Sequence, residues 1–409
     1  MKKFLLLYVC CALAISDSLQ GKTRKAIYIV IDGVAADNIE RLHPKTITEI
    51  RKTGQYSRAY CGGEVGMYSE TPTISAIGYA NLLTGTWMNK HNVKGNSNIE
   101  ANYNYWNLFR IAKEQKGRNY KTALFSSWTD NRLYLLGEGK EDNAKLKIDY
   151  VHDGYDRDKV HFPKRPHRLE IYAYDSVVCR RAAECIRQEA PDFSWVYLWY
   201  TDAAYHAYGN GSYTDQYVLK EDADIGLIWE AVKYREKNFD EEWLFIVTTD
   251  HGRNENGFGH GKQNSYAREV WFATNQKKVN KLFSPQTLSH VDLNPTICRW
   301  MDWQLPQDVR FEQDGHPFMG KIDLYDLKCP TYDKTVQLKW KHFGSSETAT
   351  VYLATDNRFA EGQRDEWIQV GTVPVKAGKY SIDLSKFPDS KFYKIVVETR
   401  NNHVTRWLK

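Results

Sequence analysis

The chain has 409 residues, of which 26% are charged and 42% hydrophobic, and its formal net charge at pH 7 is +5. This length is enough for one large core and a smaller domain, and the composition is that of a globular protein rather than a disordered or fibrous one. The basic excess is small and contains no dense run of Lys and Arg. We therefore expect neither a nucleic-acid-binding surface nor a membrane-binding patch.

Residues 1–21 have the pattern of a secretory signal peptide. Lys2 and Lys3 precede an apolar stretch, residues 4–15, which is too short to span a bilayer and ends in small residues suited to cleavage. No later stretch is long and apolar enough to cross a membrane. We expect an exported protein, either periplasmic or secreted.

From residue 25 to about residue 319, apolar runs that predict buried strands alternate with stretches that predict helices. The expected strands are residues 26–31, 122–126, 195–200, 243–248 and 270–274, and the expected helices are residues 38–53, 105–115, 169–187 and 216–236. This alternation predicts an α/β fold with a doubly wound, mostly parallel sheet. We assign residues 22–325 to this domain.

From about residue 326 the pattern changes to short alternating strands separated by turn residues. They are expected at residues 336–340, 349–353, 367–370, 380–384 and 393–397. Spacing of this kind is typical of an antiparallel β-sandwich of the immunoglobulin or fibronectin type. We assign residues 326–409 to such a domain, interpret its role as contact with a glycan or a protein, and expect Trp340, Trp367 and Trp407 in core or edge positions.

Carboxylates and imidazoles follow three of the expected buried strands. They are Asp32, Asp202, His206, Asp250 and His251. Ligands of open α/β sheets bind at the carboxyl ends of the strands, so we expect these side chains to converge. A spacing of four puts Asp202 and His206 on one face of a helix. Carboxylate oxygens and imidazole nitrogens together suit a divalent metal ion. A further histidine, His260, follows in a glycine-rich segment, residues 257–261.

The expected nucleophile at such a site is a hydroxyl at a strand-to-helix junction, since the helix N-terminus and a metal both stabilise an alkoxide. Thr71, Thr73 and Ser75 are the candidates in the segment 71–85. The two threonines flank a proline and can serve as helix caps. Ser75 has an alanine and a glycine close behind it, and these small residues leave room for a phosphate.

The combined set resembles the alkaline phosphatase superfamily over roughly residues 25–320. In alkaline phosphatases, cofactor-independent phosphoglycerate mutases and arylsulfatases, the nucleophile stands ten positions before the glycine of a Thr-Gly or Ala-Gly pair. That glycine is Gly85 here, which points to Ser75, with Thr73 as the alternative. The Asp202-to-His206 spacing and the segment 84–91 resemble type I phosphodiesterases, also called nucleotide pyrophosphatases.

The resemblance implies a site for two divalent metal ions, Zn²⁺ or, as in the mutase-like members, Mn²⁺. One ion would be held by Asp32, Ser75, Asp250 and His251, and the other by Asp202, His206 and His260. In nucleotide pyrophosphatases the last histidine lies later in the chain, which makes His290 the alternative to His260. We prefer His260, because its flanking glycines let the loop fold back over the metals.

The same resemblance implies hydrolysis of a small-molecule phosphoric ester, most simply a phosphodiester or pyrophosphate, through a phosphoseryl intermediate. Asn81 and Lys262 are expected to bind the phosphate oxygens. Two other functions stay open: a phosphomonoesterase with the same site, and a surface binding protein with a vestigial site. A sulfatase is disfavoured, because Ser75 is not followed by the Pro and Arg typical of that nucleophile motif.

Overall fold

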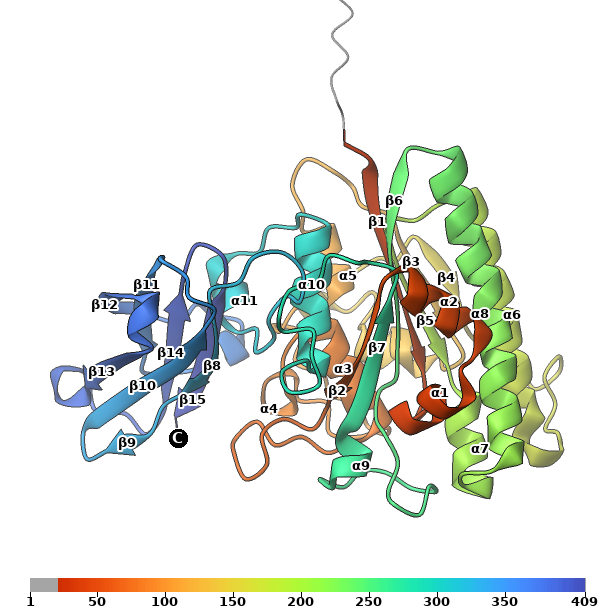
Figure 1. Ribbon diagram of the computed structural model, residues 1–409, viewed down its shortest axis with the longest axis horizontal. Helices are drawn as coiled ribbons and strands as arrows, with labels where there is room; N and C mark the ends of the chain where they lie inside the picture. The colour runs from red at the N-terminus through yellow and green to blue at the C-terminus, as the bar shows by residue number, and fades with distance from the viewer. Residues whose placement is uncertain (1–20, 409) are drawn as a thin grey trace, which may run out of the picture.

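A seven-stranded sheet forms the centre of the larger part of the computed structural model, which describes residues 21–408 (Figure 1). In spatial order its strands are β2 (Gln55–Tyr60), β7 (Glu269–Thr274), β6 (Glu241–Thr248), β1 (Thr23–Ile31), β5 (Phe193–Leu198), β3 (Thr122–Ser126) and β4 (Tyr150–His152). The run from β6 to β4 is parallel, whereas β7 and β2 pair antiparallel. The sheet is therefore mostly parallel, as predicted. The expected signal peptide falls almost wholly outside the described residues.

Helices cover both faces of this sheet. One face carries α1 (Ala36–Leu42), α2 (Lys45–Thr53), α6 (Leu169–Gln188) and α8 (Ser212–Asn238), and the other carries α3 (Ser75–Thr84), α5 (Leu108–Lys113) and α10 (Leu293–Trp300) (Figure 1). Alternate residues of β1 pack into the two cores: Ile27 and Ile29 into one, Tyr28 and Val30 into the other. Burial on both faces explains why β1 is a continuous apolar run.

Several boundaries differ by a few residues from the sequence-based expectation, and two of the differences have a clear local cause or bear on the site. The helix expected at residues 38–53 is two helices, because His43 adopts a left-handed conformation with φ 48° and Pro44 has no N–H to donate. The strand expected at residues 195–200 ends at Leu198, and α7 (Tyr200–Tyr208) begins at Tyr200. The second difference places Asp202 in the first turn of a helix, close to the carboxyl end of β5.

The C-terminal part consists of two antiparallel sheets that enclose a core of their own. One contains β13 (Lys379–Asp383), β10 (Thr335–His342) and β8 (Leu324–Lys328), with β9 (Thr331–Tyr332) beside β10, and the other contains β12 (Ile368–Pro374), β11 (Thr348–Ala354), β14 (Tyr393–Glu398) and β15 (His403–Leu408). This is the expected β-sandwich. Trp340 and Trp407 are buried and Trp367 is half-buried, in agreement with core and edge positions.

A buried ion-pair network joins the two parts. Lys394 of β14 is fully buried; its Nζ lies 2.6 Å from an oxygen of Asp365 and also donates to Glu312, which follows α11 (Gln307–Phe311). Glu312 in turn accepts a hydrogen bond from Lys90 through its backbone carbonyl. Because these charges are shielded from water, each depends on its partners.

Replacing Lys394 with Met is expected to lower the free energy of unfolding by about 3–5 kcal/mol, because the buried Asp365 loses its counter-charge and Glu312 keeps the more distant Lys90, at 3.9 Å. Urea denaturation measures the change. The control is Lys145→Gln, which removes one member of an ion pair with Glu141 whose lysine side chain is 68% exposed; it should change stability by about 0.5 kcal/mol or less. Equal effects of the two variants would contradict the network's role.

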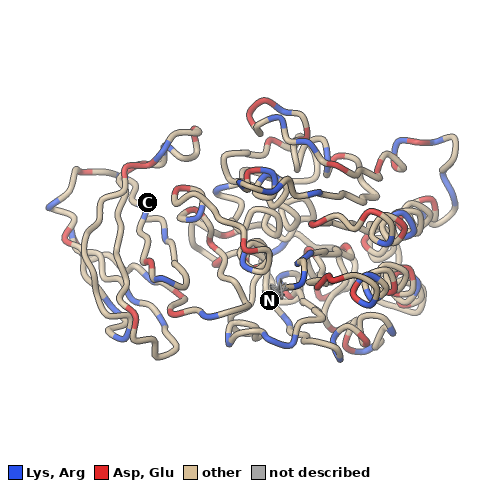
Figure 2. Tube along the Cα trace, turned by 90° about the horizontal axis from the view of Figure 1, so that it is seen from above, with Lys and Arg blue, Asp and Glu red and all other residues tan. Residues whose placement is uncertain are grey.

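Charged residues of both signs are interspersed along residues 21–408 (Figure 2), which agrees with the small formal net charge of +5. Among residues 21–408, none of the helices combines the length and the apolar character that crossing a membrane requires.

Candidate metal centre

The predicted ligands lie at the carboxyl ends of three neighbouring parallel strands. Asp32 directly follows β1, Asp202 and His206 lie on α7 just after β5, and Asp250 and His251 follow β6. Because the order in the sheet is β6-β1-β5, the three strand ends are adjacent. The fold thus brings together residues that are up to 219 positions apart (251 − 32) in the sequence.

The first group surrounds His251, whose Nε2 lies 3.4 Å from Asp32 Oδ1 and 3.2 Å from Asp250 Oδ2. The hydroxyl of Ser75 donates to the same nitrogen at 3.2 Å. Ser75 is the first residue of α3, where unpaired backbone N–H groups and the helix dipole favour negative charge. A serine in this position can be activated as an alkoxide.

The carboxylates of this group each leave one oxygen unsatisfied. Asp32 Oδ2 accepts hydrogen bonds from Tyr79 and Tyr197, and Asp250 Oδ1 accepts from the N–H of Gly33, but Asp32 Oδ1 and Asp250 Oδ2 are buried without a hydrogen-bond partner among the described residues. Burial, and next the nearby Asp250, raise the pKa of Asp32; burial raises the pKa of Asp250 to about 7. A cation between the two free oxygens would remove both penalties.

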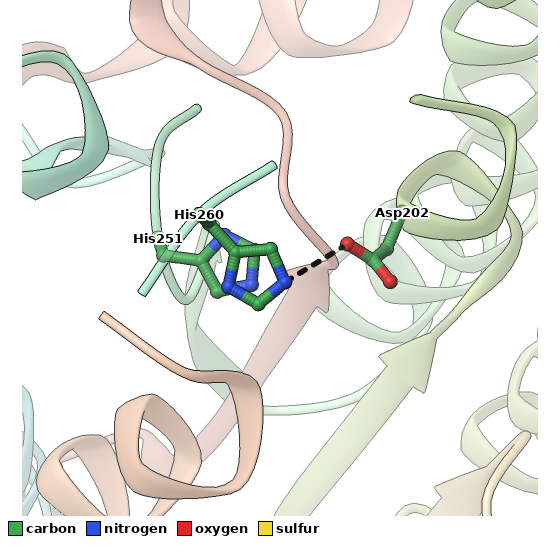
Figure 3. A group of neighbouring side chains, drawn as sticks. All are labelled: Asp202, His251 and His260. Atoms are coloured by element: carbon green, nitrogen blue, oxygen red, sulfur yellow. Dashed lines mark ion pairs between the residues drawn. The ribbon is translucent and has the colours of Figure 1, made fainter. Parts of the chain in front are cut away.

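The second group joins Asp202, His206 and His260. His206 Nε2 lies 3.3 Å from Asp202 Oδ1 and 3.1 Å from His260 Nε2, which is itself 3.7 Å from Asp202 Oδ1. Figure 3 shows His260 facing Asp202, with the ring of His251 stacked behind it at a centroid distance of 3.7 Å. His251 is close enough to both groups to link them.

Two of the histidines are held in the form that binds metals. His251 Nδ1 donates to the carbonyl of Gly252 at 2.9 Å, and His260 Nδ1 donates to the carbonyl of Thr73 at 2.8 Å. Both Nε2 atoms therefore present a lone pair to the carboxylates. Burial lowers the pKa of both imidazoles, which favours the neutral ring. The donor set fits two divalent metal ions.

The competing candidates have other partners. The hydroxyl of Thr73 donates a hydrogen bond to the carbonyl of Lys262 at 2.9 Å and accepts one from the N–H of Gly261 at 2.8 Å. Both bonds join it to the loop that carries His260. His290 begins a short 3-10 helix, and its Nε2 donates to the carbonyl of Thr249 at 2.9 Å. The structure therefore brings Ser75 and His260, rather than Thr73 and His290, to the cluster.

Of the two expected phosphate-binding residues, Asn81 is the buried one. It lies six residues beyond Ser75 on α3, is 1% exposed, and its Oδ1 accepts a hydrogen bond from His91 Nε2 at 2.9 Å inside the fold. Its part in phosphate binding stays a prediction. The side chain of Lys262 is exposed, and its part in substrate binding stays a prediction.

Several residues at the site were not anticipated from the sequence. Tyr79 and Tyr197 donate hydrogen bonds to Asp32, and Arg253 donates one to Asp202. Beside Ser75, the side-chain oxygen of Asn96 accepts a hydrogen bond from the N–H of Ala76 at 2.9 Å. Tyr79 offered a usable signal, because it stands four residues after Ser75 on the same helix face. The other three offered none, because their partners are distant in the sequence.

The helix that carries Asp202 and His206 is anchored by buried carboxyl groups. Asp175 of α6 accepts hydrogen bonds from the N–H groups of Trp199 and Tyr200, at 2.9 and 2.7 Å. Glu221 of α8 accepts from the N–H of Thr201 at 3.2 Å. These acceptors satisfy the free N–H groups at the start of α7 and fix its direction.

Replacing Tyr79 with Phe is expected to weaken binding of the ion at Asp32 by about tenfold or more, because Asp32 loses a hydrogen bond that orients it. Titration calorimetry with Zn²⁺ measures the effect. Tyr28→Phe is the matched control: its buried hydroxyl has no hydrogen-bond partner within residues 21–408, so its loss should leave metal affinity unchanged. Equal affinities in both variants would show that Tyr79 does not orient Asp32.

A comparison with protein families identifies the family of the part of the chain that carries this site. The family model of the type I phosphodiesterases/nucleotide pyrophosphatases matches residues 26–312, which is more than half of the chain. No curated protein sequence matches significantly.

Similar solved structures include a putative sulfatase from Bacteroides thetaiotaomicron, with a TM-score of 0.53 and 11% identity over 89% of this chain and 86% of that one. Human ectonucleotide pyrophosphatase/phosphodiesterase 5 has a TM-score of 0.48 and 12% identity over 69% and 96%. Phosphonoacetate hydrolase from Sinorhizobium meliloti has a TM-score of 0.41 and 15% identity, and the chain covers 57% of its length and aligns over 56% of its own. Of these, the putative sulfatase, with a TM-score above 0.5, bears on the fold alone. By its family match, this chain belongs to the type I phosphodiesterase/nucleotide pyrophosphatase family of phosphoric ester hydrolases.

Proposed function

We propose that the protein is a two-metal hydrolase of phosphodiester or pyrophosphate bonds, with Ser75 as its nucleophile. One observation supports this most strongly. The Ser75 hydroxyl, at the N-terminus of α3, shares His251 Nε2 with two buried carboxylates whose free oxygens have no hydrogen-bond partner within the described chain. A cation is the partner such an arrangement lacks.

The ligand sets are those expected from the sequence. Asp32, Ser75, Asp250 and His251 would hold one ion, and Asp202, His206 and His260 would hold the other. The mixture of carboxylates and imidazoles suits Zn²⁺, with Mn²⁺ as the alternative. When bound, such ions supply positive charge that lowers the pKa of a hydroxyl and stabilises charge on phosphate oxygens.

The residues of the chain then perform a double displacement. Ser75 loses its hydroxyl proton to solvent, and its oxygen forms a bond to phosphorus as the bond from phosphorus to the leaving oxygen breaks. The leaving group takes a proton from water. A second water then cleaves the phosphoseryl ester, releases the phosphate product and restores the serine. The N-terminus of α3 stabilises negative charge on the Ser75 oxygen, which attacks in the first step and leaves in the second.

We also propose that the protein is exported, on the strength of residues 1–21, and is periplasmic or secreted. Its natural substrate is a small-molecule phosphate ester. We further propose that residues 326–409 act as a separate domain and that a glycan or a protein is its partner.

The test compares three nitrophenyl substrates: a phosphate monoester, the diester with thymidine 5′-phosphate, and a sulfate. Purified zinc-loaded protein is assayed on each with and without a chelator. We expect faster hydrolysis of the diester and loss of this activity with the chelator. Faster hydrolysis of the monoester would instead indicate a phosphomonoesterase. No turnover of any of them would favour a binding protein with a vestigial site.

A further inference from the structure

Arg253, which follows the Asp250-His251-Gly252 segment, connects three of the other segments that supply proposed metal ligands. Its Nη2 donates to Asp202 Oδ1 at 2.6 Å, its Nε donates to the carbonyl of Gly33 at 2.8 Å, and its Nη1 donates to the carbonyl of Phe258 at 3.2 Å. The residue is only 2% exposed. One buried guanidinium thus links α7, the end of β1 and the loop that carries His260.

The surroundings of this guanidinium are shaped to hold it. Gly33 has φ +66°, and a Cβ atom there would lie 1.9 Å from the Nη2 of Arg253, so only a glycine leaves room for the side chain. The ring of Tyr205, on α7, lies under the guanidinium at 4.8 Å from its centroid, a cation–π distance. A lysine cannot replace a planar guanidinium that stacks on a ring and makes three hydrogen bonds without losing some of these contacts.

We propose that Arg253 is a positioning residue for the second metal site, formed by Asp202, His206 and His260; this inference rests on the proposed two-metal function. The loop from residue 253 to residue 261 contains Gly257, Gly259 and Gly261. Such a loop has high conformational entropy, and the bond to Phe258 restricts it near His260. The bond to Asp202 restricts the carboxylate that His206 and His260 face.

The alternative to a positioning role is that the buried Arg253 guanidinium competes with the metal ion for Asp202. A guanidinium bonded to Asp202 Oδ1 would then lower the affinity of this site for a divalent ion. The two roles predict opposite results when the guanidinium is removed. Positioning predicts that the second ion binds more weakly without Arg253, whereas competition predicts that it binds more tightly.

The experiment counts bound Zn²⁺ and measures both affinities in the full-length protein by titration calorimetry. For Arg253→Met we expect the ion at Ser75 to bind as in the wild type and the second ion to bind about 10- to 100-fold more weakly. Arg253→Lys should give an intermediate loss, because the single nitrogen of an ammonium cannot reproduce the three separate donor nitrogens of the planar guanidinium. Substrate turnover at saturating zinc should recover in part, which a general folding defect would not allow.

Arg235→Met is the matched control. Arg235 is also a buried arginine, paired with Glu241 at the opposite end of β6, so its loss should lower stability and leave both zinc affinities unchanged. If Arg253→Met does not fold, the zinc affinities of Arg253→Lys are compared with those of the wild type instead. Unchanged or tighter binding of the second ion in an Arg253 variant would overturn the inference. A wild-type protein that binds fewer than two ions would overturn the proposed function itself, and this inference with it.

Discussion

Substitution of Ser75 by Ala is expected to lower kcat/KM by on the order of 10³-fold or more, while metal binding is largely retained. The six other proposed ligands stay in place, and only the attacking oxygen is lost. The measurement is the rate of diester hydrolysis together with the zinc content of the dialysed protein. A large loss of rate without a loss of zinc would show that the Ser75 oxygen is needed as the nucleophile and that the six other ligands suffice to hold the ions.

Thr73→Val is the matched control for this substitution. Its hydroxyl is the nearest alternative nucleophile, but it bonds the carbonyl of Lys262 and the N–H of Gly261. We expect its removal to cost about 1 kcal/mol of stability and to leave the rate within about tenfold of the wild type. Full activity of Ser75→Ala, combined with an inactive Thr73→Val, would reverse the assignment.

Substitution of His260 by Ala is expected to remove the second metal ion and to abolish diester hydrolysis. The imidazole supplies one of only three proposed ligands at that site, and its Nε2 lies 3.1 Å from the Nε2 of His206. Zinc content should fall from two ions towards one. The remaining ion, at Ser75, should keep its affinity, because the proposed ligands of that group do not include His260.

His290→Gln provides the comparison for the alternative ligand. A glutamine amide can still donate to the carbonyl of Thr249, which His290 bonds in the structure. We expect this variant to bind two zinc ions and to lose at most a few kcal/mol of stability, since a buried ring is replaced. Loss of an ion in His290→Gln, with both ions kept in His260→Ala, would contradict the assignment of the second site.

Much of this site was predictable from the sequence because its ligands follow buried strands directly. The apolar runs before Asp32 and Asp250 identify strands β1 and β6 without ambiguity, and parallel strands deliver their ends to one edge. The β-sandwich was predictable for a related reason, since its strands alternate and are separated by turns. The positions of Pro44 and of the start of α7 mark where local patterns were misleading.

The supporting residues were not predictable in the same way. Tyr197 and Arg253 act on side chains 165 and 51 residues away, and no local pattern encodes such distances. The side of α3 on which Asn81 lies was not predictable either, because α3 is buried on every side, so its sequence lacks the amphipathic period that would show which face meets the ligands. Contacts of this kind require the three-dimensional structure.

Capture of the covalent intermediate tests most directly whether Ser75 is the nucleophile. Zinc-loaded protein is mixed with the thymidine diester, quenched in acid within milliseconds, digested and examined by mass spectrometry. We predict that the peptide containing Ser75 gains the mass of a nucleotidyl group, that fragmentation places it on the Ser75 oxygen, and that chelator prevents it. An adduct on Thr73, or rapid turnover with no adduct at any quench time, would contradict the account.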